Sequence, residues 1–340
     1  EGPISRYSEI GDDLFAGRDI DYHNFVYGYQ RIAWGLFKKM MVADRLAGLV
    51  FILFKEYRKN EGASLAIAAI CYTIQLYNEF SGCIDIVIGS GEIFGIKLPE
   101  NFRQPFFADN ASDFWRRWHI TLGTWLKDYI FYPISLAKPI KNFAKKIKKI
   151  FGVNVSKYVA PTIALFFVWL CNGIWHGAGS TYLFYGMYYF VFIFFETITE
   201  STFQKFYEKH NISKNNIILK ILRTAKLWFI VVIGELFFRA PTLTQGFEMF
   251  KMIFTGVDIS KIPSVDFGID KYDRLMSFLC VILVFIVDIL HEKGICIRDK
   301  IAELSKPVRW AFWYAMIMSI ILTGAYGAGY TVMDMIYAGF

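Results

Sequence analysis

The amino-acid sequence predicts an all-α integral membrane protein with several transmembrane helices. Hydrophobic residues make up 55% of the chain and aromatic residues 19%, whereas charged residues make up only 20%, and the mean hydropathy is +0.36. Soluble domains typically hold about 25% charged residues, so this chain has more apolar surface than one soluble core needs. The apolar residues also form continuous runs, without the strict alternation of a membrane β-barrel. We therefore expect a polytopic helical protein of a cell membrane.

Uncharged stretches locate the expected spans. Residues 158–195 contain no Asp, Glu, Lys or Arg, a length that suits two spans of about 20 residues each. The Gly-rich stretch Asn172–Gly179 is the expected break between them. In all, we expect about six to eight crossing or re-entrant helices. Further apolar segments lie at residues 46–54, 62–78, 227–238, 275–287 and 310–333.

The start of the chain carries neither an initiator methionine nor a signal peptide pattern. Nothing in the sequence resembles a soluble linker between two domains. We therefore expect residues 1–340 to form a single membrane domain, the C-terminal part of a longer chain whose N-terminal helices are missing.

The net charge of +7 is concentrated in one place. Six lysines lie within residues 138–149, between hydrophobic segments. Beside membrane spans, such a stretch is typical of a cytoplasmic loop that faces anionic lipid, and we expect no nucleic-acid partner. The five cysteines form no CxxC pair, so neither a disulfide nor a metal site is predicted.

Residues 110–128 differ from the spans because their apolar side chains recur at helical spacing. Trp115, Trp118 and Leu122 fall on one face, while Arg116 and Arg117 lie elsewhere on the helical wheel. This pattern predicts a helix that lies in the membrane interface. His119 is placed at the edge of the Trp-rich face, where it could serve chemistry or simply accompany an anchoring helix.

His176 is the only ionisable group apart from tyrosine and cysteine in residues 158–195. Ionisable residues inside a membrane are rare and costly, so a functional role is the first hypothesis. A neutral imidazole in a protein-lined cavity could take a proton from an alcohol that attacks an acyl carbonyl. A structural histidine that hydrogen-bonds a neighbouring carbonyl fits the same pattern.

Other polar residues within apolar segments are weaker candidates. Glu79 and Asp85 could orient a histidine, bind substrate or pair with an arginine. Glu235 and Arg239 are four residues apart, so an ion pair on one helix face explains both. Gly89–Gly95 has a glycine pattern similar to a dinucleotide fingerprint, but its spacing is wrong and no βαβ unit surrounds it.

Several of these motifs occur in an order that is similar to a known family. The stretches are Glu1–Tyr7, Tyr77–Asp85 leading into Pro99–Phe102, Phe114–His119 (FWRRWH), Trp175–Gly177 (WHG), Phe237–Ala240 and Gly327–Tyr330. Together they resemble the membrane-bound O-acyltransferase (MBOAT) superfamily, most of all the bacterial branch that O-acetylates exported polysaccharides. Two departures are Glu79, where such proteins usually carry Asp, and the Cys171-Asn172 context before the WHG triplet.

The resemblance implies an O-acyltransferase with His176 as the catalytic histidine and His119 as a second polar site residue across a tunnel. The tunnel or substrate positions that we expect are Asn172, Trp175, Trp115, Trp118, Arg116, Glu79 and Asp85. The expected substrate is a cytoplasmic acyl thioester, either acetyl-CoA or an acyl carrier, with no bound cofactor. The expected partners are membrane lipid and a membrane-anchored or extracytoplasmic acyltransferase.

Three other functions stay open at this point. The same fold could transfer D-alanine from a carrier to teichoic acid, with the carrier docking near the basic stretch. A proton-coupled transporter could use His176, Glu79 and Asp85 as a relay, although no paired halves are visible. A scaffold without catalysis would not need both histidines.

Overall fold

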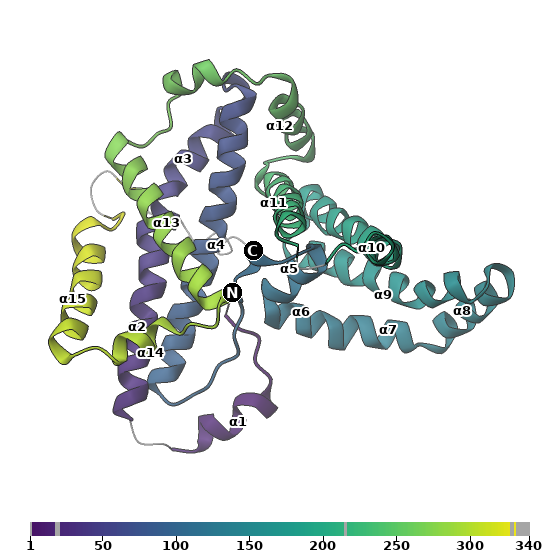
Figure 1. The fold of residues 1–340 in the computed structure, drawn as a ribbon, viewed down its shortest axis with the longest axis horizontal. Coiled ribbons are helices and arrows are strands. Elements are labelled where there is room, and N and C mark those ends of the chain that lie inside the picture. The colour runs from purple at the N-terminus through teal and green to yellow at the C-terminus, as the bar shows by residue number, and fades with distance from the viewer. Residues whose placement is uncertain (1, 18–20, 214–215, 327–329, 331–340) are drawn as a thin grey trace. The chain divides into compact units, whose positions relative to one another are not determined.

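A computed structural model describes residues 2–17, 21–213, 216–326 and 330 of the chain. These residues form helices and connecting segments, and no β-strand occurs among them, as the sequence predicts. The chain divides into two compact units (Figure 1). The first unit comprises Glu1–Gln104 and Glu248–Phe340, and the second unit comprises Pro105–Phe247. Each unit is described by itself.

The first unit begins with helices that lead into a long central helix and ends with three more. A π-helical segment, η1 (Phe37–Ala43), joins α2 to α3 without a break. In chain order the α-helices are α1 (Tyr7–Phe15), α2 (Tyr22–Leu36), α3 (Asp44–Lys55), α4 (Gly62–Ile93), α13 (Lys271–Glu292), α14 (Ile297–Ala302) and α15 (Lys306–Thr323). Two 3-10 segments, η2 (Tyr57–Lys59) and η5 (Ile259–Ser264), complete the unit.

Helices α2 and α4 run side by side in the first unit because glycines let their backbones approach (Figure 1). A Cβ atom on Gly28 would lie 2.6 Å from the carbonyl oxygen of Gly89, and one on Gly35 would lie 2.5 Å from that of Gly82. Small residues at a helix interface permit this close packing in membrane proteins. The glycine at position 89 therefore serves helix packing, consistent with rejecting the dinucleotide fingerprint.

The second unit carries short helices first and long ones afterwards. Its helices are α5 (Ala111–Arg117), α6 (Ile120–Leu126), α7 (Tyr132–Leu136), α8 (Lys138–Phe151), α9 (Val153–Trp175), α10 (Ser180–Lys209) and α11 (Ile217–Arg239). A 3-10 turn, η3 (Pro105–Phe107), precedes α5, and a π-helical segment, η4 (Lys127–Phe131), joins α6 to α7. Helix α12 (Leu243–Thr255) begins in the second unit and ends in the first.

Three of the described helices are long and apolar enough to cross a membrane: α9, α10 and α13. Helices α9 and α10 divide the uncharged run as predicted, with a short turn between them. The total of six to eight crossing or re-entrant helices stays a prediction. Of the last expected span, residues 310–333, the structure describes residues 310–326 and 330, because residues 327–329 and 331–333 lie outside the described residues. Glu1, in the first family-like stretch, lies outside them too.

The basic stretch, predicted as a connection between membrane spans, forms a helix, and its cytoplasmic location stays a prediction. Helix α8 carries all six lysines, and none of its residues is buried. Its apolar residues recur at helical spacing, at Ile140, Phe143, Ile147 and Ile150, so the opposite face can hold the lysines. This amphipathic pattern is typical of a helix at a charged membrane surface.

Candidate functional site

His176 lies directly after the last residue of α9, at the turn that leads into α10. Its backbone N–H donates to the carbonyl oxygens of Asn172 (3.3 Å) and Gly173 (3.2 Å), which ends the helix. Gly177 follows with a φ of 138°, a conformation that residues with a side chain rarely adopt. The side chain of His176 is buried, with 4% of its surface exposed. The predicted Gly-rich break is therefore confirmed, although it begins later than Asn172.

Close contact between α9 and α10 holds the turn in place. A Cβ atom on Gly173 would lie 2.7 Å from the carbonyl oxygen of Tyr182, and one on Gly186 would lie 2.3 Å from that of Trp169. Both positions therefore require glycine for this helix pair to approach as it does. As a result, His176, at the end of α9, lies close to the first turns of α10.

Aromatic rings surround the His176 imidazole. The Tyr185 ring, from α10, lies edge to face with it at a centroid distance of 5.9 Å. The Phe238 ring, from α11, does the same at 5.1 Å. Tyr185 and Phe238 contact each other as well, at 4.9 Å. Side chains from α10 and α11 thus lie against the imidazole of His176.

The FWRRWH segment is not one continuous helix, so that part of the prediction was wrong. Helix α5 ends before Trp118, which is extended, and α6 starts after His119. His119 has φ 49° and ψ 50°, the left-handed conformation, which only a few per cent of non-glycine residues adopt. Strained backbone of this kind is frequently found at functional sites. The break places a buried imidazole, 7% exposed, between two helices.

Polar contacts to α10 fix the beginning of α5. Asn110 caps the helix, because its side chain accepts a hydrogen bond from the N–H of Asp113 (2.8 Å). The carboxylate of Glu196 accepts from the N–H groups of Ala111 (3.2 Å) and Ser112 (3.3 Å). A carboxylate suits a helix N-terminus because the free N–H groups and the helix dipole both favour negative charge.

The two buried histidines belong to the same unit, and both have lowered pKa values. Both lie outside the three candidate membrane spans. Burial, and to a smaller extent the nearby His176, lower the pKa of His119 to about 3. Burial also lowers the pKa of His176, to about 4. Because a lowered histidine pKa means that the neutral form persists at neutral pH, both imidazoles can accept or donate a proton without first losing a charge.

The predicted tunnel residues of the second unit occupy different environments. Trp118 is buried and stacks on Phe114, with ring centroids 5.5 Å apart. Trp115 lies edge to face with Trp169 at 4.9 Å. Asn172 is 4% exposed, and its side-chain oxygen has no hydrogen-bond partner in the described part of the chain.

Two other predicted positions lie at the surface of the second unit. Trp175 is 52% exposed and contacts Trp125. The side chain of Arg116 is 70% exposed and pairs with Asp113 at 3.4 Å. The structure thus groups Trp115, Trp118 and Asn172 with the buried part of the unit and leaves Arg116 and Trp175 outside it.

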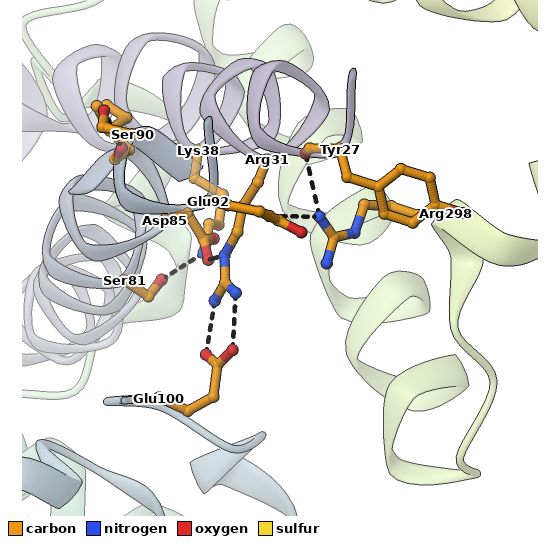
Figure 2. A network of polar contacts seen from close by, with 10 residues as sticks. Tyr27, Arg31, Lys38, Ser81, Asp85, Ser90, Glu92, Glu100 and Arg298 are labelled. Atoms are coloured by element: carbon orange, nitrogen blue, oxygen red, sulfur yellow. Dashed lines mark hydrogen bonds and ion pairs between the residues drawn. The ribbon is translucent and has the colours of Figure 1, made fainter. Parts of the chain in front are cut away.

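Glu79 and Asp85 belong to α4 in the first unit, where basic side chains surround them. Figure 2 shows Asp85 between Lys38, whose Nζ lies 2.5 Å from the carboxylate, and Arg31, whose Nε lies 3.0 Å from it. Arg31 also makes a bidentate contact with Glu100, at 2.6 and 2.7 Å. Glu79 is 3% exposed and lies 3.6 Å from the Nζ of Lys39. Of the three roles considered for Asp85, these contacts support pairing with an arginine.

The charged network lines a cavity of about 720 Å³ within the first unit. Apolar side chains of α13 and α15 form much of its wall, among them Leu283, Val287 and Met316. The hydroxyl of Tyr77 donates to Asp288 across it, at 2.9 Å. A cavity of this size and lining can hold a small organic ligand. Among the described residues, no group of three or more His, Cys, Asp or Glu side chains could hold a metal ion.

The sequence did not single out Tyr185, Phe238 and Glu196 as site residues. Aromatic residues are so frequent between 158 and 195 that nothing distinguishes Tyr185 there. Glu235 was singled out with an ion pair to Arg239 as its explanation, but the partner that the structure shows for its carboxyl group is a tyrosine. The Tyr185 hydroxyl donates to Glu235 instead, at 2.9 Å.

The chain is similar in sequence to several curated bacterial proteins. The probable alginate O-acetylase of Pseudomonas aeruginosa is 32% identical over 254 residues, which is 75% of this chain and 43% of the relative. The peptidoglycan O-acetyltransferase of Helicobacter pylori is 31% identical over 252 residues, 74% of this chain and 43% of the relative. The teichoic acid D-alanyltransferase of Bacillus subtilis is 28% identical over 212 residues, 62% of this chain and 49% of the relative.

The chain thus spans less than half the length of the curated relatives it matches. Residues 2–235 match the family model described as the membrane-bound O-acyltransferase family, and they include both buried histidines. The chain therefore belongs to the membrane-bound O-acyltransferase family.

Proposed function

We propose that this chain carries the catalytic histidines of an O-acyltransferase that moves an acetyl group from a cytoplasmic thioester towards a hydroxyl of an exported cell-surface polysaccharide. The observation that carries the proposal is the pair of buried imidazoles, His119 and His176, each placed at a helix break of the second unit. The similarity to alginate and peptidoglycan O-acetyltransferases supports the acetyl group and the polysaccharide class.

In the proposed reaction His176 acts as the general base. One of its ring nitrogens takes the proton of the acceptor hydroxyl while the hydroxyl oxygen attacks the thioester carbonyl carbon. The carbon–sulfur bond then breaks, and the leaving thiolate takes the proton back from the imidazolium. The donor is acetyl-CoA or an acyl carrier, and neither needs a bound cofactor because the thioester carbonyl is already activated.

His119 is proposed to assist by hydrogen bonding. A neutral imidazole can donate its N–H to the carbonyl oxygen as negative charge develops there, or it can hold the acceptor. The aromatic side chains around His176 exclude water, which protects the thioester from hydrolysis. Trp115, on α5, and Trp118, directly after it, pack against Trp169 and Phe114 of the same unit.

The setting that we propose is the bacterial cytoplasmic membrane, with several passes through it. A membrane-anchored or extracytoplasmic acyltransferase would complete the transfer to the polymer. Helix α8, with six lysines and no buried residue, supports contact with anionic membrane lipid.

A second candidate differs only in the acyl group. The similarity to teichoic acid D-alanyltransferases favours D-alanine from a carrier as the alternative to acetate. A proton-coupled transporter that uses His176, Glu79 and Asp85 as a relay receives less support. Lys39 already lies against Glu79, and both Arg31 and Lys38 lie against Asp85.

Both candidates can be tested in one experiment in the bacterium that makes the protein. A strain that lacks the gene receives the full-length wild type, His176→Ala or no gene. Ester-linked acetate and D-alanine on the cell-surface polymers are then measured. We expect the wild type to restore acetate and His176→Ala to match the deletion, with equal amounts of protein in the membrane. Restoration of D-alanine alone would select the second candidate, and unchanged levels of both in His176→Ala would refute acyl transfer by this histidine.

A further inference from the structure

A buried carboxyl group lies beside the proposed site without belonging to it. Glu235, on α11, is 1% exposed and is surrounded by the apolar residues of that helix. Its Oε1 accepts the hydrogen bond from the Tyr185 hydroxyl, whereas Oε2 has no hydrogen-bond partner in the described part of the chain. Burying a carboxyl group this deeply costs free energy, so its presence calls for an explanation.

Tyr185 connects this carboxyl group to His176. Its hydroxyl points to Glu235 on α11, while its ring lies edge to face with the imidazole at 86°. The Phe238 ring, three residues after Glu235 on the same helix, contacts both Tyr185 and His176. The wall around the imidazole therefore consists of a tyrosine held by α11 and a phenylalanine carried by α11.

A second tyrosine on α10 makes a similar bond without contacting the histidine. The Tyr188 hydroxyl donates to the carbonyl oxygen of Ile230, at 2.8 Å, and so also joins α10 to α11. The ring contacts described for Tyr188 are with Phe184, Tyr189 and Phe192. The chain therefore offers a matched pair of helix-joining tyrosines, of which only Tyr185 contacts the imidazole.

We infer that Glu235 is a positioning residue for His176 and acts through Tyr185. The carboxyl oxygen fixes the hydroxyl end of the tyrosine, and the fixed ring then sets the orientation of the imidazole. The role needs a hydrogen-bond acceptor at position 235 and does not need a charge. The inference rests on the proposed function for its effect on turnover, but the placement of the imidazole can be measured without it.

Four variants of the full-length protein test this inference. Tyr185→Phe removes the donor, Glu235→Leu removes the acceptor, Glu235→Gln keeps an acceptor of the same shape, and Tyr188→Phe is the matched control. In isolated membranes with acetyl-CoA as donor, we expect Tyr185→Phe and Glu235→Leu to lower kcat about tenfold with KM for the donor unchanged, since small displacements of a catalytic group reduce rates by this order or more. We expect Glu235→Gln and Tyr188→Phe to keep wild-type kcat.

The second measurement does not depend on activity. In protein with ¹⁵N-labelled histidine, the ring-nitrogen resonances of His176 are identified by their loss in His176→Ala. We expect them to shift in Tyr185→Phe and Glu235→Leu and to stay in place in the other two variants. Protein levels in the membrane and elution profiles in detergent check that each variant folds. If Glu235→Leu does not fold, Tyr185→Phe, which loses only one oxygen atom, still tests the inference.

The possible results separate the two hypotheses. Wild-type resonances and wild-type kcat in Tyr185→Phe would overturn the positioning role. Impairment of Glu235→Gln equal to that of Glu235→Leu would overturn it too, because the carboxyl group itself would then be required. If His176→Ala turns over acetyl-CoA like the wild type, the proposed function fails, and the resonance shifts alone still decide whether Glu235 positions the imidazole.

Discussion

Both units bury ionisable side chains, but they do so in opposite ways. In the first unit, Asp85 lies against two cations, and Arg31 binds a second carboxylate at Glu100 (Figure 2). In the second unit, His119 and His176 are both buried, aromatic rings lie against His176, and the Glu235 carboxyl receives a single neutral donor. Charge is therefore neutralised by opposite charge around Asp85, whereas the ionisable groups around His176 are neutral or sparsely bonded.

This difference suggests that the buried charges of the first unit serve the stability of the fold, whereas the buried histidines of the second unit serve proton transfer. An ion-pair network that satisfies its own charges resists unfolding after it has formed, because removal of one member leaves another charge buried. Buried neutral imidazoles contribute little to such a network but remain able to exchange protons. Variants in the first unit should therefore change stability most, and variants in the second unit should change turnover most.

The largest effect is expected from Asp85→Ala. It leaves Lys38 with Ser81 as its remaining polar contact and Arg31 with Glu100. Removing one partner of a buried pair costs roughly 3–5 kcal/mol, so the midpoint of thermal unfolding in detergent should fall by several degrees. Glu100→Gln is the matched control with a smaller effect, since that side chain is 42% exposed. An unchanged midpoint in Asp85→Ala would remove the distinction between the units.

The next effect is expected from His119→Asn and concerns turnover. Asparagine tolerates the left-handed backbone of this position but lacks the imidazole, so the fold should persist while acyl transfer falls about a hundredfold. His119→Ala should lose transfer equally and stability in addition, by about 1 kcal/mol, because alanine is strained at φ 49°. Wild-type transfer by His119→Asn would leave this histidine a structural role only.

A smaller effect is expected from pH. Because burial lowers the pKa of His176 to about 4, its neutral form predominates at both pH 7.5 and pH 6. Transfer by wild-type membranes should then change less than about twofold over this range. A histidine of ordinary pKa would be only about one quarter neutral at pH 6. A decline with an apparent pKa near 6.5 would contradict the buried, neutral base.

The smallest effect is expected from Arg116→Ala. The side chain is 70% exposed, and its ion pair with Asp113 is of the surface kind, worth about 0–1 kcal/mol. Transfer rate and thermal midpoint should both stay close to wild type. A large loss of transfer with a normal midpoint would show that this arginine contacts a substrate.

The sequence predicted the helices better than their interruptions. The break at His176 was predictable from the glycines that surround it. In the structure one of them, Gly177, has a positive φ. The break at His119 was not, because no glycine or proline lies within three residues of it and only the packed unit holds a histidine in the left-handed conformation. The helix at residues 138–151 was missed because its lysines were given more weight than the helical spacing of its isoleucines.

The partners of the buried side chains were beyond prediction for a different reason. Arg31 lies 54 residues before Asp85, and Tyr185 lies 50 residues before Glu235. Spacing along one helix can suggest a near neighbour such as Arg239, but it carries no information on which other helix lies alongside. The two histidines could be selected from residue type and surroundings, whereas the rings that lie against His176 required the fold.

The central claim is that His176 is the base of a thioester-dependent acyl transfer. Its most direct test is the rate at which purified full-length protein in lipid vesicles transfers labelled acetyl from acetyl-CoA to its isolated polysaccharide acceptor, together with the partner acyltransferase. We predict that His176→Ala lowers this rate at least about a hundredfold while its thermal midpoint stays near that of the wild type. Transfer by His176→Ala at the wild-type rate would contradict the claim.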